Sequence, residues 1–103
     1  MTPVRRPPSA VHRAWWLYLL ACRGGRTYAG IALDVDARFK AHLGGKASKF
    51  TRANPPLKIL GAQAFATRSE ASKAEYVLKQ LSRPAKLEWA RRQGRSSFRK
   101  SIA

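Results

Sequence analysis

The first part of the chain alternates short apolar runs with glycines, a pattern typical of β-strands joined by turns. Residues 15–21 (Trp-Trp-Leu-Tyr-Leu-Leu-Ala) form a continuous aromatic and aliphatic run, as a buried strand should. Gly24 and Gly25 follow as a hairpin signal, and residues 27–31 resume an apolar pattern. This order predicts two antiparallel strands connected by a tight turn.

The next segment is bounded like a helix. Asp34 is a suitable N-cap and Gly44-Gly45 a suitable terminator, so residues 35–43 are predicted to be helical. An alternating, strand-like pattern is also present, formed by Val35, Ala37, Phe39, Ala41 and Leu43. The strand stays open as an alternative, but the cap, the terminator and the alanines favour the helix.

A basic connection and a third strand follow. Residues 45–55 form a polar, basic stretch with room for one helical turn, and Pro55-Pro56 ends it. Residues 57–65 are an apolar run loosened by Gly61, and they predict a strand.

The last part of the core region predicts two helices. Thr67 and Glu70 match a capping box. A helical period follows, carried by Ala71, Ala74, Val77, Leu78 and Leu81. Pro84 is expected to interrupt this pattern, with a short helix resuming to about Arg92. The order of elements predicts an α+β fold, a small three-stranded antiparallel sheet flanked by helices.

Composition divides the 103 residues into one domain and two extensions. Residues 1–13 are rich in Pro, Arg and Ser without an apolar period and predict a flexible basic arm. Residues 14–92 hold the apolar patterns and are the expected domain, and residues 93–103 form a basic tail.

Charge adds the first indication of function. The chain has 21 Lys and Arg against 5 Asp and Glu, a formal net charge of +16. Such a surface concentrates and steers polyanions. Acidic membrane lipid is the alternative target, but no apolar run is long enough to span a bilayer. For so small and so basic a domain, we expect nucleic acid rather than a membrane as the partner.

The single cysteine limits the chemistry. Cys22 alone excludes an intrachain disulfide and a zinc site built on several cysteines, and it fits a reducing, cytoplasmic location. Residues 19–22 (Leu-Leu-Ala-Cys) loosely resemble a lipoprotein processing site. Cleavage there would remove the first predicted strand, which favours the cytoplasmic alternative.

Three charged or titratable residues lie at the margins of the predicted helices. Arg38 and His42 are four residues apart, so they share a helix face, beside the apolar stripe. A surface arginine and a packed histidine are the alternative interpretation. Glu75 lies on the rim of the next helix's stripe, where Lys79 offers it an ordinary ion pair.

Together with two short motifs, these residues resemble the GIY-YIG nuclease family. Trp16-Leu17-Tyr18 and Tyr28-Ala29-Gly30 are similar to the family's paired motif, and Arg38-x-x-x-His42 and Glu75 follow in the family's order. The resemblance covers about residues 15–90. It is strongest to small stand-alone bacterial members, which are similar to the catalytic subunit of the structure-selective junction nuclease.

The resemblance implies a role for each residue. Tyr18 would be the base that activates water, with His42 as its proton partner. Tyr28 and Arg38 would bind and stabilise the phosphate. Glu75 would hold one Mg²⁺ or Mn²⁺ ion. With five acids in the chain, two of them expected caps, a two-metal site is not expected, whereas a hydrated Mg²⁺ needs only one or two carboxylates.

Two physical conditions must hold for these roles. The pKa of Tyr18 would have to fall from its ordinary value of about 10, and Arg38, the metal and the positive field are expected to lower it. Tyr18 and Tyr28 must also share a sheet face, which requires a loop of three or five residues or a bulge between the strands. Gly30 is expected to let a helix or the substrate approach the backbone.

Basic residues next to the first helix are candidates for DNA contact. Lys46, Lys49 and Arg52 are expected to bind backbone phosphates, which positions DNA without reading its sequence. Phe50, between them, is expected in the core rather than stacked on a base.

The sequence therefore predicts a metal-dependent DNA endonuclease that selects branched or single-strand-containing DNA in repair or recombination, with a protein partner supplying further specificity. The alternatives are a non-catalytic DNA- or RNA-binding module on the same fold and a small ribosome-associated basic protein. Three departures from the family pattern stand out: Trp16 replaces a glycine, Ala29 an isoleucine, and no asparagine follows Glu75.

Overall fold

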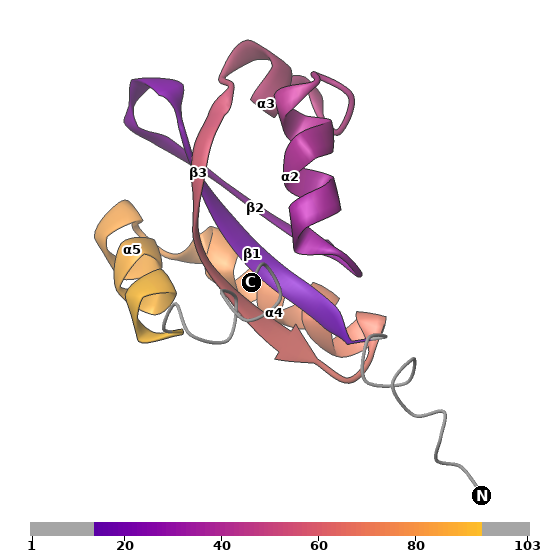
Figure 1. The fold of residues 1–103 in the computed structure, drawn as a ribbon. Helices are drawn as coiled ribbons and strands as arrows, with labels where there is room; N and C mark the ends of the chain where they lie inside the picture. Colours follow the sequence, from indigo (N-terminus) through magenta and orange to yellow (C-terminus); the bar gives the residue numbers. More distant parts are fainter. Residues whose placement is uncertain (1–13, 94–103) are drawn as a thin grey trace, which may run out of the picture.

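The computed structural model describes residues 14–93, so the arm predicted over residues 1–13 and residues 94–103 of the predicted tail lie outside the described residues. The elements are, in order, β1 (Trp15–Cys22), the 3-10 turn η1 (Arg23–Gly25), β2 (Arg26–Ala32), α2 (Val35–Leu43), α3 (Lys49–Ala53), β3 (Pro56–Phe65), α4 (Arg68–Gln80) and α5 (Arg83–Arg92). The strands form one antiparallel sheet in the order β2-β1-β3, with helices on both faces (Figure 1). The predicted α+β class is confirmed.

The helices begin where polar side chains cap them. Each α-helix of the described residues follows an N-cap side chain that accepts a hydrogen bond from the backbone N–H three residues later; the caps are Asp34, Ser48, Thr67 and Ser82. Each cap contributes about 1 kcal/mol. The helix predicted over residues 35–43 is confirmed, and the strand alternative for it is wrong.

The helix pair at the end of the chain differs from the prediction at one point. Pro84 does not interrupt a helix; it lies in the first turn of α5, where the missing N–H of proline costs nothing. The break comes earlier, where α4 ends at Gln80 and Ser82 caps α5. Within residues 14–93, none of the helices has the length and apolar character needed to cross a membrane.

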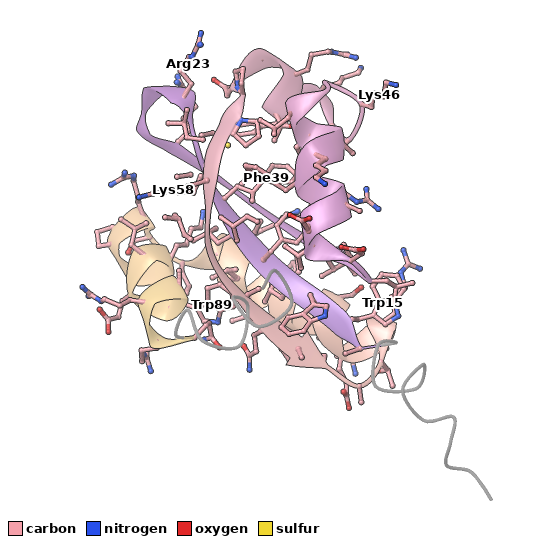
Figure 2. The ribbon with its side chains drawn as sticks, viewed as in Figure 1. Trp15, Arg23, Phe39, Lys46, Lys58 and Trp89 are labelled. Carbon is pink, nitrogen blue, oxygen red and sulfur yellow. The ribbon has the colours of Figure 1, made fainter. Side chains whose placement is uncertain are left out.

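The central strand β1 separates two apolar cores, because alternate side chains point to opposite faces. Leu17 and Leu19 enter the core under α4 and α5, which includes Trp89. Tyr18 points the other way, into the core under α2. Phe39, labelled in Figure 2, packs against this core from α2. The sheet face that carries Tyr18 therefore receives the side chains of α2.

Gly61 in β3 has a packing role. A Cβ atom at this position would lie 2.7 Å from the carbonyl oxygen of Ala90, so the missing side chain lets α5 pack directly on the sheet. This contact lies on the face opposite to Tyr18, away from the candidate site described next.

Candidate active site

The turn between β1 and β2 sets the relative position of the two motif tyrosines. The three residues of η1 separate the paired Cys22 and Arg26. In the resulting register Leu20 lies opposite Tyr28, and Leu20 shares a face with Tyr18. Tyr18 and Tyr28 therefore lie on the same face, and the predicted odd-length loop is confirmed.

Gly30 makes room for the ring of Tyr18. The two residues are directly paired across β1 and β2. A Cβ atom on Gly30 would lie 2.5 Å from Tyr18 Oη and 2.7 Å from Cζ. The ring thus crosses the edge strand β2 at the glycine. A close approach at Gly30 is made by the side chain of the neighbouring strand.

A buried hydrogen bond joins the first motif to α2. Tyr18 Oη lies 2.9 Å from His42 Nε2, and the two residues are only 3% and 2% exposed. The ring of Tyr28 contacts the same imidazole edge-on, with centroids 5.0 Å apart and planes at 65°. Three of the predicted site residues, one from each of three elements, are thereby in direct contact.

The other nitrogen of His42 has a partner that the sequence analysis missed. His42 Nδ1 lies 2.7 Å from Thr51 Oγ1 in α3, and Thr51 is 1% exposed. Thr51 in turn contacts Ser48, the N-cap of α3. The spacing Ser48-x-x-Thr51 is the N-cap spacing of a helix, and it was the one sequence signal that could have drawn attention to Thr51. Nothing in the sequence, however, connects this spacing to His42.

The electrostatics of the pair differ from the prediction. Burial raises the pKa of the Tyr18 phenol well above its ordinary value of 10.0; Tyr28 and Glu75 add to the rise, and the charge of Arg38 opposes it. The predicted fall of this pKa is wrong for the protein alone, because desolvation outweighs Arg38. For His42, burial followed by Arg38 lowers the pKa below 6.5, so the imidazole is neutral near pH 7.

Arg38 and Glu75 act on this pair through their charges. The guanidinium of Arg38 is exposed, and it influences the pKa of both Tyr18 and His42. Glu75 on α4 also influences the pKa of Tyr18, although α4 packs on the other face of the sheet. Arg38 thus favours the phenolate form of Tyr18 and Glu75 disfavours it.

Comparison with known proteins agrees with this geometry. The family model of the GIY-YIG catalytic domain matches residues 14–88. The chain belongs to the GIY-YIG family. Domains of this family are generally endonucleases acting on DNA with divalent metal ions, which indicates a nuclease.

Relatives of similar size support the family and the fold. A UPF0213 protein of Xanthomonas campestris pv. campestris is 50% identical over 82 residues, which cover 80% of each chain. One from Bacillus licheniformis is 44% identical, with 77% and 84% of the two chains covered. The solution NMR structure of a UPF0213 protein from Bacillus halodurans is 37% identical and superposes with a TM-score of 0.50, covering 79% of this chain and 86% of the other. The name UPF0213 describes no activity, so the reaction must be argued from the site.

The donor set of this GIY-YIG site suits a hydrated ion. Within the described residues, no group of three or more His, Cys, Asp or Glu side chains is arranged to hold a metal. The side chain of Glu75 is 22% exposed and lies 3.1 Å from Lys79 Nζ, the ion pair that the sequence offered as an alternative. Because the lysine is 49% exposed, water screens the pair and it contributes little. One accessible carboxylate fits Mg²⁺, which keeps several waters and takes substrate phosphate oxygens.

Phe50 and the basic residues border the site on the α3 side. Phe50 stacks on Tyr28, with ring centroids 5.6 Å apart and planes at 24°, and it is 38% exposed. Its predicted place in the core is wrong, because the ring packs on Tyr28 but stays 38% exposed. The predicted DNA contacts Lys46, Lys49 and Arg52 are all exposed, and Lys46 lies just beyond the end of α2 (Figure 2).

Proposed function

We propose that this GIY-YIG protein is a metal-dependent endonuclease that hydrolyses phosphodiester bonds of branched or single-strand-containing DNA in repair or recombination. The observation that carries the proposal is the buried hydrogen bond between Tyr18 and His42, with the ring of Tyr28 in contact with the same imidazole.

Proton transfer in this proposal requires both members of the pair. A phenol with a raised pKa is protonated near pH 7, so Tyr18 accepts a proton from the attacking water only if its own proton leaves. Neutral His42 has an acceptor 2.9 Å away from the hydroxyl. The base is therefore the Tyr18–His42 pair, with the phenol facing the water and the imidazole behind it.

The phosphate is bound by the polar groups at the rim. The guanidinium of Arg38 offers paired N–H donors that match phosphate oxygens and stabilise the charge that develops in the transition state. The hydroxyl of Tyr28, on the same face as Tyr18, donates a further hydrogen bond to the phosphate. Both residues hold the scissile phosphate against the Tyr18 hydroxyl.

The carboxylate of Glu75 holds the divalent ion, either Mg²⁺ or Mn²⁺. When bound there, the ion supplies Lewis-acid stabilisation of the leaving oxygen and of the phosphate charge. To hold the ion, Glu75 would give up its contact with Lys79, and this loss would cost little because the lysine is 49% exposed.

Selection of DNA by shape follows from the kind of contacts available. The available contacts are to DNA phosphates, made by Lys46, Lys49 and Arg52. Such contacts fix the position of the DNA backbone on the protein and carry no sequence information. Recognition in this proposal comes from the course of the DNA backbone, as in branched or single-strand-containing substrates. Further specificity comes from a protein partner.

The first test measures cleavage of a panel of branched, nicked, single-stranded and linear DNA with Mg²⁺, Mn²⁺ or chelator. We expect metal-dependent cutting by the wild type and a loss of at least about tenfold in Glu75→Gln, which removes the charge that holds the ion. Binding of DNA to Glu75→Gln in chelator should match the wild type. The matched control is Glu88→Gln, which removes an exposed acid on α5 that pairs with Arg91.

The outcomes separate the two candidate functions. Cutting by the wild type and Glu88→Gln but not by Glu75→Gln supports the nuclease. Tight binding without metal-dependent cutting of any DNA in the panel would make the protein a binding module, and a preference for structured RNA would favour a ribosomal or RNA-associated role.

The decrease of kcat/KM at acidic pH tests the protonation state of His42. Because burial and Arg38 lower the pKa of His42, its neutral, proton-accepting form persists as the pH falls to 6.5 and is lost only below it. We expect kcat/KM to be level down to about pH 6.5 and to fall below that value. An activity that begins to fall well above pH 6.5 would contradict a neutral His42 in the free protein.

The three basic residues should contribute affinity without sequence preference. Replacing Lys46, Lys49 and Arg52 together by alanine is expected to reduce the slope of log K against log salt concentration by roughly 0.9 for each lost contact to duplex phosphate. The loss should be uniform across DNA sequences. Fluorescence anisotropy at several salt concentrations measures both, and an unchanged slope would show that DNA binds on another face.

A further inference from the structure

The hydrogen bonds of His42 continue beyond the predicted site. From Tyr18 Oη the chain passes to His42 Nε2 at 2.9 Å and from His42 Nδ1 to Thr51 Oγ1 at 2.7 Å. It then passes to Ser48 Oγ at 2.8 Å. Tyr18, His42 and Thr51 are buried, whereas Ser48 is only half-buried. The chain thus leads from the site toward solvent through α3.

The chemistry of these groups allows two directions of hydrogen bonding. In one, the Tyr18 hydroxyl donates to Nε2, Nδ1–H donates to Thr51, and the Thr51 hydroxyl donates to Ser48. In the other, every donor and acceptor is exchanged, and the oxygen of Tyr18 accepts from Nε2–H. The second arrangement is the one that stabilises a phenolate, so reversing the chain and removing one proton converts phenol to phenolate.

A buried imidazole that accepts a proton on one nitrogen must be able to release a proton from the other. Taking the proton of Tyr18 without releasing another would make His42 an imidazolium, which its burial and the charge of Arg38 disfavour. The groups that face His42 are Arg38 on its own helix, Tyr18 on β1, Tyr28 on β2 and Thr51 on α3. Once Tyr18 has taken a proton from the attacking water and is neutral again, none of these groups carries a negative charge that would compensate an imidazolium.

We propose that Thr51 and Ser48 are positioning residues that hold His42 with Nδ1 protonated and pass the proton of Tyr18 to solvent, an inference that rests on the proposed nuclease function. As the O–H bond of Tyr18 breaks, Nε2–H forms and Nδ1–H breaks. Thr51 Oγ1 takes that proton and gives its own to Ser48 Oγ, whose original proton leaves to water. One proton enters the chain and one leaves, and His42 is neutral before and after.

The geometry of α3 supports this role. The Ser48 side chain accepts a hydrogen bond from the backbone N–H of Thr51, so the N-cap fixes the two hydroxyls relative to each other. The five-residue helix is too short to be stable by itself. Its buried polar contact to His42 instead gives it a defined place against α2, and Thr51 Oγ1 is held at the imidazole.

Two measurements test the proposal on the 103-residue chain. The first is ¹⁵N NMR of the His42 side chain near neutral pH, which reports which ring nitrogen carries the proton. We expect the Nδ1–H form in the wild type and in Thr51→Ser, and a shift toward Nε2–H in Thr51→Val. The Nε2–H form in the wild type would overturn the proposal, even if Thr51→Val failed to fold.

The second measurement is steady-state cleavage with Mg²⁺. Thr51→Val should lower kcat by about tenfold with KM nearly unchanged, and Thr51→Ser should restore kcat. Thr27→Val makes the same chemical change on the sheet face opposite to Tyr28 and should leave kcat unchanged. Wild-type kcat in Thr51→Val would overturn the relay alone. A wild type that cuts no DNA would instead overturn the nuclease function, and the relay with it.

Discussion

Replacing Tyr18 by phenylalanine is expected to lower kcat by about 10²–10⁴-fold, the usual contribution of a positioned base. The ring keeps its place over Gly30, and only the hydroxyl that bonds His42 is lost. Removing a buried hydrogen-bonding partner should also reduce the free energy of unfolding by about 1–3 kcal/mol. Single-turnover cleavage and thermal unfolding measure the two effects separately.

The matched control for this variant is Tyr76→Phe. Tyr76 lies on α4 next to Glu75 in the sequence, but it is 68% exposed and makes no described contact with His42. Its replacement should leave both kcat and stability near the wild type. If Tyr18→Phe cut DNA within about tenfold of the wild type, a group other than the Tyr18–His42 pair would have to activate the water.

Replacing Gly30 by alanine is expected to affect stability and activity together. The added Cβ would collide with Tyr18 Oη and Cζ, so the ring must move away from His42 or β2 must shift. Overpacking of this kind costs about 1–3 kcal/mol. A displacement of about 1 Å at a catalytic group lowers rates on the order of 10²-fold. Both effects have one cause, the lost space above the edge strand.

Gly61→Ala separates these two effects. Its Cβ would meet the backbone of Ala90, 2.7 Å from the carbonyl oxygen and 2.9 Å from Cα, so it strains the packing of α5 by a similar collision. We expect a comparable loss of stability in unfolding experiments. At a temperature where both variants are folded, Gly61→Ala should cleave normally and Gly30→Ala should not. Equal activities would show that the position of the Tyr18 ring has no part in cleavage.

The local sequence determined the elements and their order. The side chain of the N-cap Asp34 accepts a hydrogen bond from a backbone N–H only three residues away. The turn after Cys22 is likewise set by the glycines within it. Interactions between residues close in the sequence are therefore sufficient to place these elements. The predicted strands end within one residue of the observed ones. The misplaced break at Pro84 arose from treating a residue suited to the first turn of a helix as an interruption. The spacing of Arg38 and His42 likewise placed both on one helix face without tertiary information.

The tertiary structure alone decided how the side chains behave chemically. The partners Tyr18 and His42 are 24 positions apart, and the sequence contains no measure of the burial that raises one pKa and lowers the other. For the same reason Thr51 was overlooked and Phe50 was misplaced, because the position of α3 depends on its packing against α2 and β2. Periodicity and capping act within a few residues, whereas desolvation and hydrogen bonding across the sheet depend on which distant segments meet.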